Sequence, residues 1–128
     1  MKVITLKQPW ATLVAEGLKK YEFRSWKCSY RGELLIHAGA GVDKEAMQSV
    51  AHLNYTFPKK RIIAEVNLTD CILLDEEKSK AINKTCPLVY RDKIRTGYAF
   101  KLEDVEKINI DVEIPGKLGF WEYNIKEC

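Results

Sequence analysis

The stretch "QPWATLVAEGLKKYEFRSW", Gln8–Trp26, begins like a short helix and ends like a β-strand. Pro9 suits the first position of a helix, because the N–H that proline lacks has no partner there. Gly17 can adopt the positive φ that commonly ends a helix. Apolar residues follow the i, i+3, i+4 spacing of one helix face: Trp10, Leu13 and Val14. The stretch therefore predicts a helix over 9–16 followed by a strand over 20–26.

The predicted strand carries opposite charges on one face. Successive side chains of a strand point to opposite faces, so Glu22 and Arg24 lie together while Tyr21 and Phe23 face the core. Lys19 precedes the regular strand, and the turn from helix to strand can bring it to the charged side. One interpretation is a polar pocket that binds a phosphate or a base edge. The other is a solvated face whose ion pair contributes little stability.

The rest of the chain predicts further strands and two short helices. Asp43 is a suitable N-cap for a helix over 44–53, and a second helix is expected over 75–82. Glycines 39–41 are expected to end a strand, residues 103–105 to form a hairpin turn, and 83–97 to be turns. The expected strands cover 2–6, 32–38, 61–74, 98–102 and 106–114. Since the later strands lack crossover helices, we expect one α+β domain over 1–128, a small and mostly antiparallel β-barrel with two or three short helices.

Composition restricts the class of protein. A chain of 128 residues that is 46% hydrophobic can bury one ordinary core. No apolar run approaches the roughly 20 residues that span a bilayer, and the N-terminus lacks a secretory pattern, so a cytoplasmic protein is expected. The four cysteines form no C-x-x-C pair, which predicts reduced thiols, no metal site and no cofactor. The net charge of +3 permits nucleic-acid binding without requiring it.

Three motifs resemble one known family. They are Q-P-W-A at 8–11, G-x-K-x-x-E-x-R-x-W at 17–26, and R-G-x-x-x-I-H-A at 31–38. This pattern resembles the ASCH domain, and "GYAFKLEDV" and "GKLGFWEY" resemble its later elements. The resemblance implies a PUA-like fold with a cleft beside the first helix and second strand. It also implies RNA, another single-stranded nucleic acid or a nucleoside-type small molecule as the ligand of a monomer or weak dimer.

The resemblance and the residue types together suggest a set of ligand-binding residues. Tryptophans can stack on bases, although they are equally common in cores. His37, at a predicted strand end, is either a hydrogen-bonded structural residue or a ligand contact. The candidates are Gln8, Pro9, Trp10, Lys19, Glu22, Arg24, Trp26, Arg31 and His37.

An enzymatic alternative stays open. The wider family includes amidohydrolases that remove an acetyl group from modified cytidine, with the motif G-x-K-T-x-T-x-R. The corresponding run here keeps Lys19 and Arg24 but has Lys20 and Glu22 at the threonine positions, so a threonine nucleophile is missing. Glu22 and Lys19 remain candidate catalytic groups, and His37 could join them in a ribonuclease. The sequence favours a binding module over this hydrolase; a partner-binding role in a transcriptional or translational assembly is a third alternative with less support.

Overall fold

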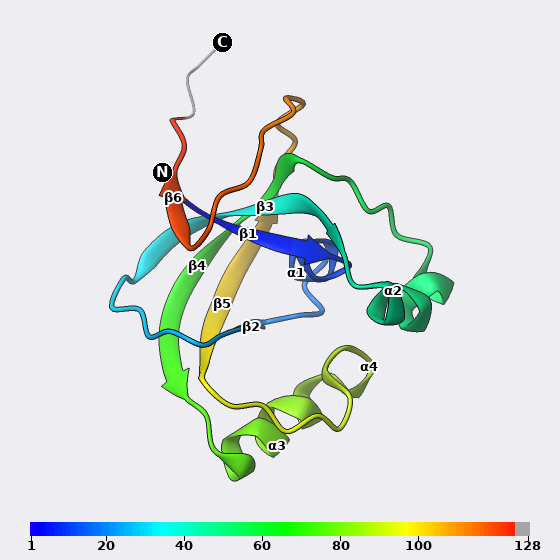
Figure 1. Ribbon diagram of the computed structural model, residues 1–128, viewed down its shortest axis with the longest axis vertical. Helices are drawn as coiled ribbons and strands as arrows, with labels where there is room; N and C mark the ends of the chain where they lie inside the picture. Colours follow the sequence, from blue (N-terminus) through cyan, green and yellow to red (C-terminus); the bar gives the residue numbers. More distant parts are fainter. Residues whose placement is uncertain (125–128) are drawn as a thin grey trace.

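The structure, a computed structural model, describes residues 1–124 and is organised around one six-stranded mixed sheet (Figure 1). The strands are β1 (Lys2–Gln8), β2 (Tyr21–Arg24), β3 (Gly32–Val42), β4 (Arg61–Leu73), β5 (Tyr98–Lys107) and β6 (Phe120–Glu122). The helices are α1 (Trp10–Ala15), α2 (Lys44–Val50), α3 (Glu76–Thr85) and α4 (Pro87–Tyr90), with a 3₁₀ turn, η1 (Ala51–Leu53), after α2. The strand order is β2-β5-β4-β3-β1-β6, and within residues 1–124 only the β1–β3 pair is parallel. The predicted α+β class with a mostly antiparallel sheet is confirmed.

The predicted closure into a barrel is wrong. Within residues 1–124, the edge strands β2 and β6 do not pair with each other. Aromatic side chains lie between them instead: the ring of Trp26, just after β2, is 5.1 Å from that of Phe120 in β6 and 5.1 Å from that of Phe100 in β5. Because β6 is only three residues long, side-chain packing and not a hydrogen-bonded ladder covers this side of the core.

The predicted strand break at the glycines is also wrong. β3 continues through them to Val42. A Cβ atom added at Gly39 would lie 2.9 Å from the Cγ2 atom of Thr5 in β1. The missing side chain therefore allows β1 and β3 to run close together, and the glycines serve the strand pairing instead of ending it.

The predicted hairpin at 103–105 does not form. β5 runs through these residues to Lys107, with a positive φ of 53° at Asp104 and register shifts against β4. The extra turn-like residue is thus absorbed as an irregularity inside one long strand. After Lys107 the expected strand over 106–114 is replaced by a loop that passes the start of β4. There, Ile108 N donates to Ile63 O and Ile114 N donates to Lys60 O.

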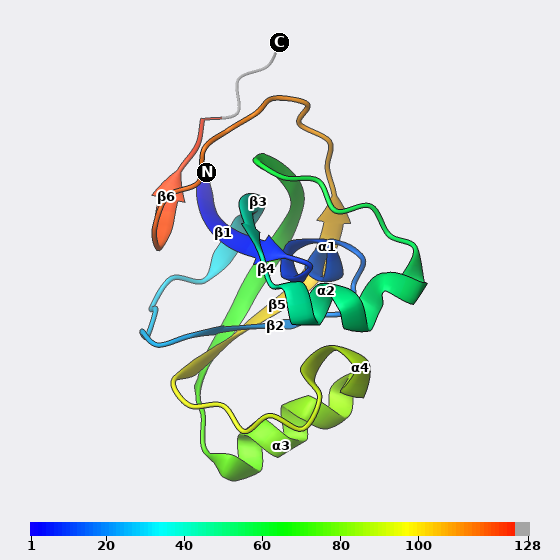
Figure 2. The same cartoon turned by 45° about the vertical axis from the view of Figure 1, so that its right-hand side comes forward.

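The helices predicted over 44–53 and 75–82 are present as α2 and α3. The helix α4 is an addition within 83–97, where only turns were expected. Asp43 and Asp75 cap α2 and α3 through hydrogen bonds from Ala46 N (3.1 Å) and Lys78 N (2.7 Å). Figures 1 and 2 show α3 and α4 together at one end of the molecule, beside β2 and the start of β5. No helix within the described residues has the length and apolar character needed to cross a membrane.

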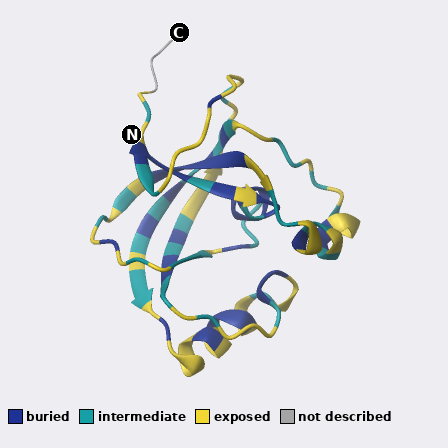
Figure 3. Ribbon diagram, in the orientation of Figure 1, coloured by how far each residue is buried: buried dark blue, intermediate teal, exposed yellow. Residues whose placement is uncertain are grey.

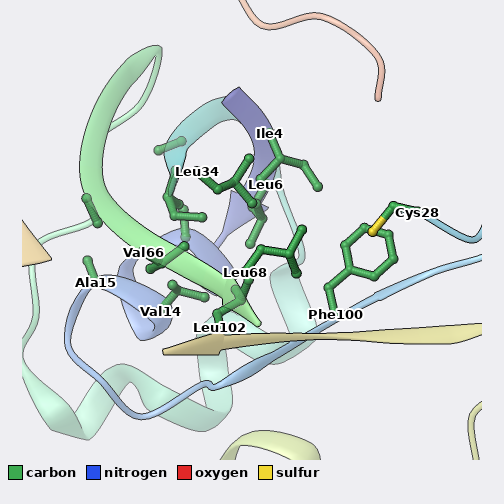
Figure 4. Close-up of a cluster of buried hydrophobic side chains, with 14 residues drawn as sticks. Ile4, Leu6, Val14, Ala15, Cys28, Leu34, Val66, Leu68, Phe100 and Leu102 are labelled. Atoms are coloured by element: carbon green, nitrogen blue, oxygen red, sulfur yellow. The ribbon is translucent and has the colours of Figure 1, made fainter. Parts of the chain in front are cut away.

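Two hydrophobic clusters hold the elements around the site. The first joins the sheet to α1 through side chains such as Leu6, Val14 and Phe100 (Figure 4), and the buried bands of Figure 3 follow it along the strands. The second joins α1 to α3, α4 and β5, and includes Leu13 and Tyr90. Because consecutive residues of α1 contribute to different clusters, this short helix fixes the position of α4 relative to the sheet.

His37 lies inside the protein, fully buried. Its Nε2 is 2.6 Å from Ile114 O, which can only accept, so Nε2 carries the proton. Its Nδ1 is 3.1 Å from Thr5 Oγ1, which already accepts from Trp121 Nε1 at 3.0 Å. Burial lowers the pKa of His37, although the hydrogen bond to Ile114 opposes this shift. The imidazole is therefore held in its neutral form as a structural connector between β3, β1 and the loop before β6.

The stability of the protein is expected to fall as the pH drops below 6.5, the ordinary pKa of histidine. In that range the unfolded chain binds a proton at His37 that the native protein does not, so the free energy of unfolding decreases. Urea unfolding between pH 7.5 and 5 should show a steeper pH dependence for the wild type than for His37→Gln. His52→Gln, which changes an exposed histidine, should keep the wild-type slope. Equal slopes for the wild type and His37→Gln would contradict this assignment.

Candidate ligand-binding cleft

A cleft of about 220 Å³ opens between the start of α1, strand β2 and the segment that follows α4. Its lining combines aromatic rings with charged groups. The residues are Trp10, Lys19, Glu22, Phe23, Val89, Tyr90, Arg91, Lys93 and Arg95.

Lys19 and Glu22 form a largely buried ion pair at this cleft. The backbone N–H groups of Leu18 and Lys19 both donate to Leu13 O, which ends α1 and turns the Lys19 side chain inward. Lys19 Nζ donates to Glu22 Oε1 at 2.8 Å and to Tyr21 O, and the two side chains are only 4% and 13% exposed. The structure thus places the Lys19 side chain beside the charged face of β2, the direction that the sequence analysis considered for it.

The environment of Lys19 disfavours its charged form. Burial lowers its pKa most strongly, Glu22 acts in the opposite direction, and Arg95 and Arg24 lower the pKa further. Its Nζ lies 5.2 Å from the centre of the Phe23 ring and 5.9 Å from that of Trp10. The ammonium has three N–H donors, of which the described protein atoms accept two. One donor therefore remains beside a carboxylate that still has acceptor capacity.

Tyr90 holds the cleft side of β2 in place. Its hydroxyl accepts from Lys20 N at 2.8 Å and from Tyr21 N at 3.1 Å, which satisfies two donors at the outer edge of the sheet. The Tyr90 ring packs edge-on against the rings of Tyr21 and Phe23, at 6.3 and 5.8 Å. Burial raises the pKa of Tyr90 to about 12, so its hydroxyl stays protonated. α4 thereby positions the strand that carries Glu22.

The cleft brings together three of the predicted ligand-binding residues: Trp10, Lys19 and Glu22. Arg24 lies behind Glu22 and does not line the cleft. Its Nε donates to Glu22 Oε2 at 3.0 Å and its Nη2 to Thr5 O at 2.9 Å, so it holds the carboxylate in place.

The other predicted residues lie elsewhere. Gln8 and Pro9 are buried at the start of α1, where Gln8 Oε1 accepts from Thr12 N at 3.0 Å. His37 is buried beside Thr5, as described above. Trp26 packs among aromatic rings at the sheet edges, and Arg31 is exposed, with Nη1 donating to the backbone of the preceding loop.

Sequence reasoning missed the part of the cleft contributed by 89–95. The charged run "RDKIR" at 91–95 was the available signal, but it stands in a segment without clear periodicity. Only the packing of α4 against β2 brings this run beside Lys19 and Glu22.

Comparison with known proteins identifies relatives over nearly the whole chain. The profile of the ASCH domain matches residues 4–112. Activating signal cointegrator 1 is 25% identical in Homo sapiens and 23% identical in Mus musculus, each over 96% of this chain. These alignments cover 22% of each relative, so the chain spans about a fifth of their length.

Solved structures with this fold include an ASCH protein from Zymomonas mobilis. It has a TM-score of 0.59 and 19% identity, over 96% of this chain and 87% of the other. A point mutant of that protein has a TM-score of 0.52 and 20% identity, over 86% and 76% of the two chains. The likeness confirms the predicted PUA-like fold.

Proposed function

Because the chain belongs to the ASCH domain family, we propose that it binds single-stranded RNA or a nucleoside-type ligand in the cleft lined by Trp10, Lys19 and Glu22. Nucleic-acid binding is the general function that the family resemblance implies. The cleft is the part of this chain whose chemistry suits such a ligand.

The observation that carries the proposal is the hydrogen-bonded pair of Lys19 and Glu22, a donor and an acceptor in a cleft that is also lined by the Trp10 ring. A base edge presents acceptors and donors side by side, and Lys19 Nζ and Glu22 Oε1, 2.8 Å apart, offer the complementary groups. The ring of Trp10, whose centre lies 5.9 Å from Lys19 Nζ, can stack against a base. A volume of about 220 Å³ lies below the roughly 300–1,000 Å³ of pockets for drug-sized ligands, which suits one base.

Lys19→Met is expected to weaken binding by roughly tenfold or more, because it removes a charge-assisted hydrogen bond while leaving Glu22 paired with Arg24. Calorimetric titration with cytidine, N4-acetylcytidine and a single-stranded RNA octamer measures the effect. Lys20→Met is the matched control, since Lys20 is the exposed neighbour in sequence and does not line this cleft. Similar affinities for the wild type and a folded Lys19→Met protein would refute the cleft assignment.

A hydrolase is the second candidate, and the lowered pKa of Lys19 favours it. A lysine with a lowered pKa beside a carboxylate can serve in general acid–base catalysis. The residues that line the cleft include no Ser, Thr or Cys, so the nucleophile would be a water molecule. His37 lies outside the cleft, which leaves Lys19 and Glu22 as the acid–base groups for cleaving an amide or RNA. Mass spectrometry of the same titration mixtures would show deacetylated cytidine or shortened RNA if catalysis occurs.

Three expectations from the sequence stay predictions. They are the monomeric or weakly dimeric state, the cytoplasmic location, and activity without a metal or cofactor.

A further inference from the structure

A basic rim stands beside the Lys19–Glu22 pair and is not used by it. Arg91, Lys93 and Arg95 come from the segment after α4 and line the same cleft. Glu22 is the only acidic lining residue, and its two oxygens already accept from Lys19 and Arg24. Arg91 Nη1 donates to Glu45 Oε1 at 2.8 Å, outside the cleft lining. The positive charge of Lys93 and Arg95 is therefore the part of the rim that is not balanced.

Arg95 is held in place entirely by neutral groups. Its guanidinium lies 4.5 Å from the centre of the Phe23 ring. Nη1 donates to Asn83 Oδ1 at 2.9 Å and to Lys93 O at 3.4 Å, while Nη2 donates to Tyr90 O at 2.9 Å. Asn83, itself only 6% exposed, is oriented by its own hydrogen bond to Lys93 O at 2.9 Å.

The cationic group of Arg95 has spare donors and no counter-charge. No carboxylate within the described part of the chain forms an ion pair with Arg95 or with the Lys93 side chain. Three of the five guanidinium N–H donors are used, and the Nε–H has no acceptor within residues 1–124. Burial lowers the pKa of Arg95, and the nearby Arg91 acts in the same direction. A pre-positioned guanidinium with free donors is suited to bind a phosphate.

We infer that the ligand of this cleft carries a phosphate group, which binds at a subsite formed by Arg95 and Lys93. The inference rests on the proposed function and specifies its ligand: a nucleotide or a phosphodiester strand, and not a free nucleoside. The phosphate lies beside the base that Lys19 and Glu22 contact, since all four residues line one cleft.

A neighbouring groove offers a way to distinguish the two sources of phosphate. This groove, about 380 Å³ in volume, shares Arg91 with the cleft and is lined by Lys80 and Lys84 on α3. A longer strand bound in the cleft can continue into it, whereas a mononucleotide does not extend that far. Lys84→Gln should therefore weaken binding of an oligonucleotide only if the strand takes this path.

The test is a calorimetric comparison of cytidine, cytidine 5′-monophosphate and an RNA octamer of cytidine. The wild type should bind the monophosphate at least tenfold more tightly than cytidine. Lys93→Gln and Arg95→Gln should each reduce that preference to threefold or less, without changing cytidine affinity by more than threefold. For the octamer, each substitution should reduce the slope of log affinity against log salt by about 0.7. Lys27→Gln, an exposed lysine outside the cleft, is the control and should retain the preference.

The outcomes separate this inference from the proposed function. Equal affinities of the wild type for cytidine and its monophosphate, or a preference that survives in Lys93→Gln, would overturn the phosphate subsite while leaving base binding intact. Failure of all three probes to bind would overturn both. The Lys93 side chain makes no hydrogen bond or ion pair with the described residues, so Lys93→Gln remains informative even if Arg95→Gln does not fold. An effect of Lys84→Gln on the octamer alone identifies a strand as the source of the phosphate. Octamer binding that is no tighter than that of the monophosphate and is unchanged in Lys84→Gln identifies a mononucleotide.

Discussion

Glu22→Gln is expected to lower the free energy of unfolding by roughly 3–5 kcal/mol, as when one partner of a buried ion pair is removed. The substitution keeps the shape of the side chain. It takes away the negative charge of Glu22, which partly offsets the cost of burying the Lys19 ammonium. Lys19 is 4% exposed, so water cannot replace the lost partner without a structural change. Urea unfolding at pH 7 measures the loss. Glu33→Gln, an exposed carboxylate on β3, is the matched control and should change stability by less than about 0.5 kcal/mol.

The double variant Lys19→Met/Glu22→Gln should recover much of the stability lost in Glu22→Gln, because the fully buried charge of Lys19 is gone. Arg24 then lacks its carboxylate, but its side chain is 22% exposed and its Nη2 still donates to Thr5 O. The pH dependence has a defined sign. In Glu22→Gln the native pKa of Lys19 falls further below the ordinary 10.5, so the unfolded chain binds more protons and stability rises with pH toward 10.5. A double variant as unstable as Glu22→Gln would show that the buried charge of Lys19 is not the cause.

Tyr90→Ala is expected to destabilise the protein by roughly 3–5 kcal/mol, the range for removing a large aromatic side chain from a core. The Tyr90 side chain is 1% exposed and joins α4 to β2 and β5 through the second hydrophobic cluster. Tyr90→Phe keeps the ring but removes the acceptor for Lys20 N and Tyr21 N. Its expected cost is about 1–3 kcal/mol, the penalty for leaving buried donors unsatisfied. Thermal or urea unfolding of both variants measures these differences.

Both Tyr90 variants should also weaken ligand binding, because each removes the hydroxyl that holds the start of β2. Leu118→Ala, at a residue that is 98% exposed, should change neither stability nor binding beyond about 0.5 kcal/mol. A Tyr90→Phe protein with wild-type stability would contradict the role of the hydroxyl in holding β2.

Local patterns predicted much of the fold correctly. Apolar spacing and end signals located α1, and Asp43 marked the start of α2, because these features act within one or two turns of chain. The helix expected over 75–82 is α3, for which the structure shows Asp75 as the N-cap. Alternation along 20–26 correctly placed Glu22 and Arg24 on one face of β2. The predicted strand ends were wrong at two places where turn-forming residues lie inside a long pair of hydrogen-bonded strands. The glycines after Ala38 and the residues around Asp104 resemble strand ends locally, but β1 and β4 pair with the chain through both places.

The amino-acid sequence was sufficient to indicate the α+β class, the family resemblance, and the shared strand face of Glu22 and Arg24 after α1. These depend on short-range spacing, which a single chain displays directly. The open sheet edge, the burial of Gln8 and His37, and the basic rim of the cleft depend on which distant segments meet. Tyr90 and Arg95 join the site because hydrophobic burial docks α4 against β2, some 70 residues away in the chain. Such contacts are set by packing between elements, and no local pattern in the sequence reports them.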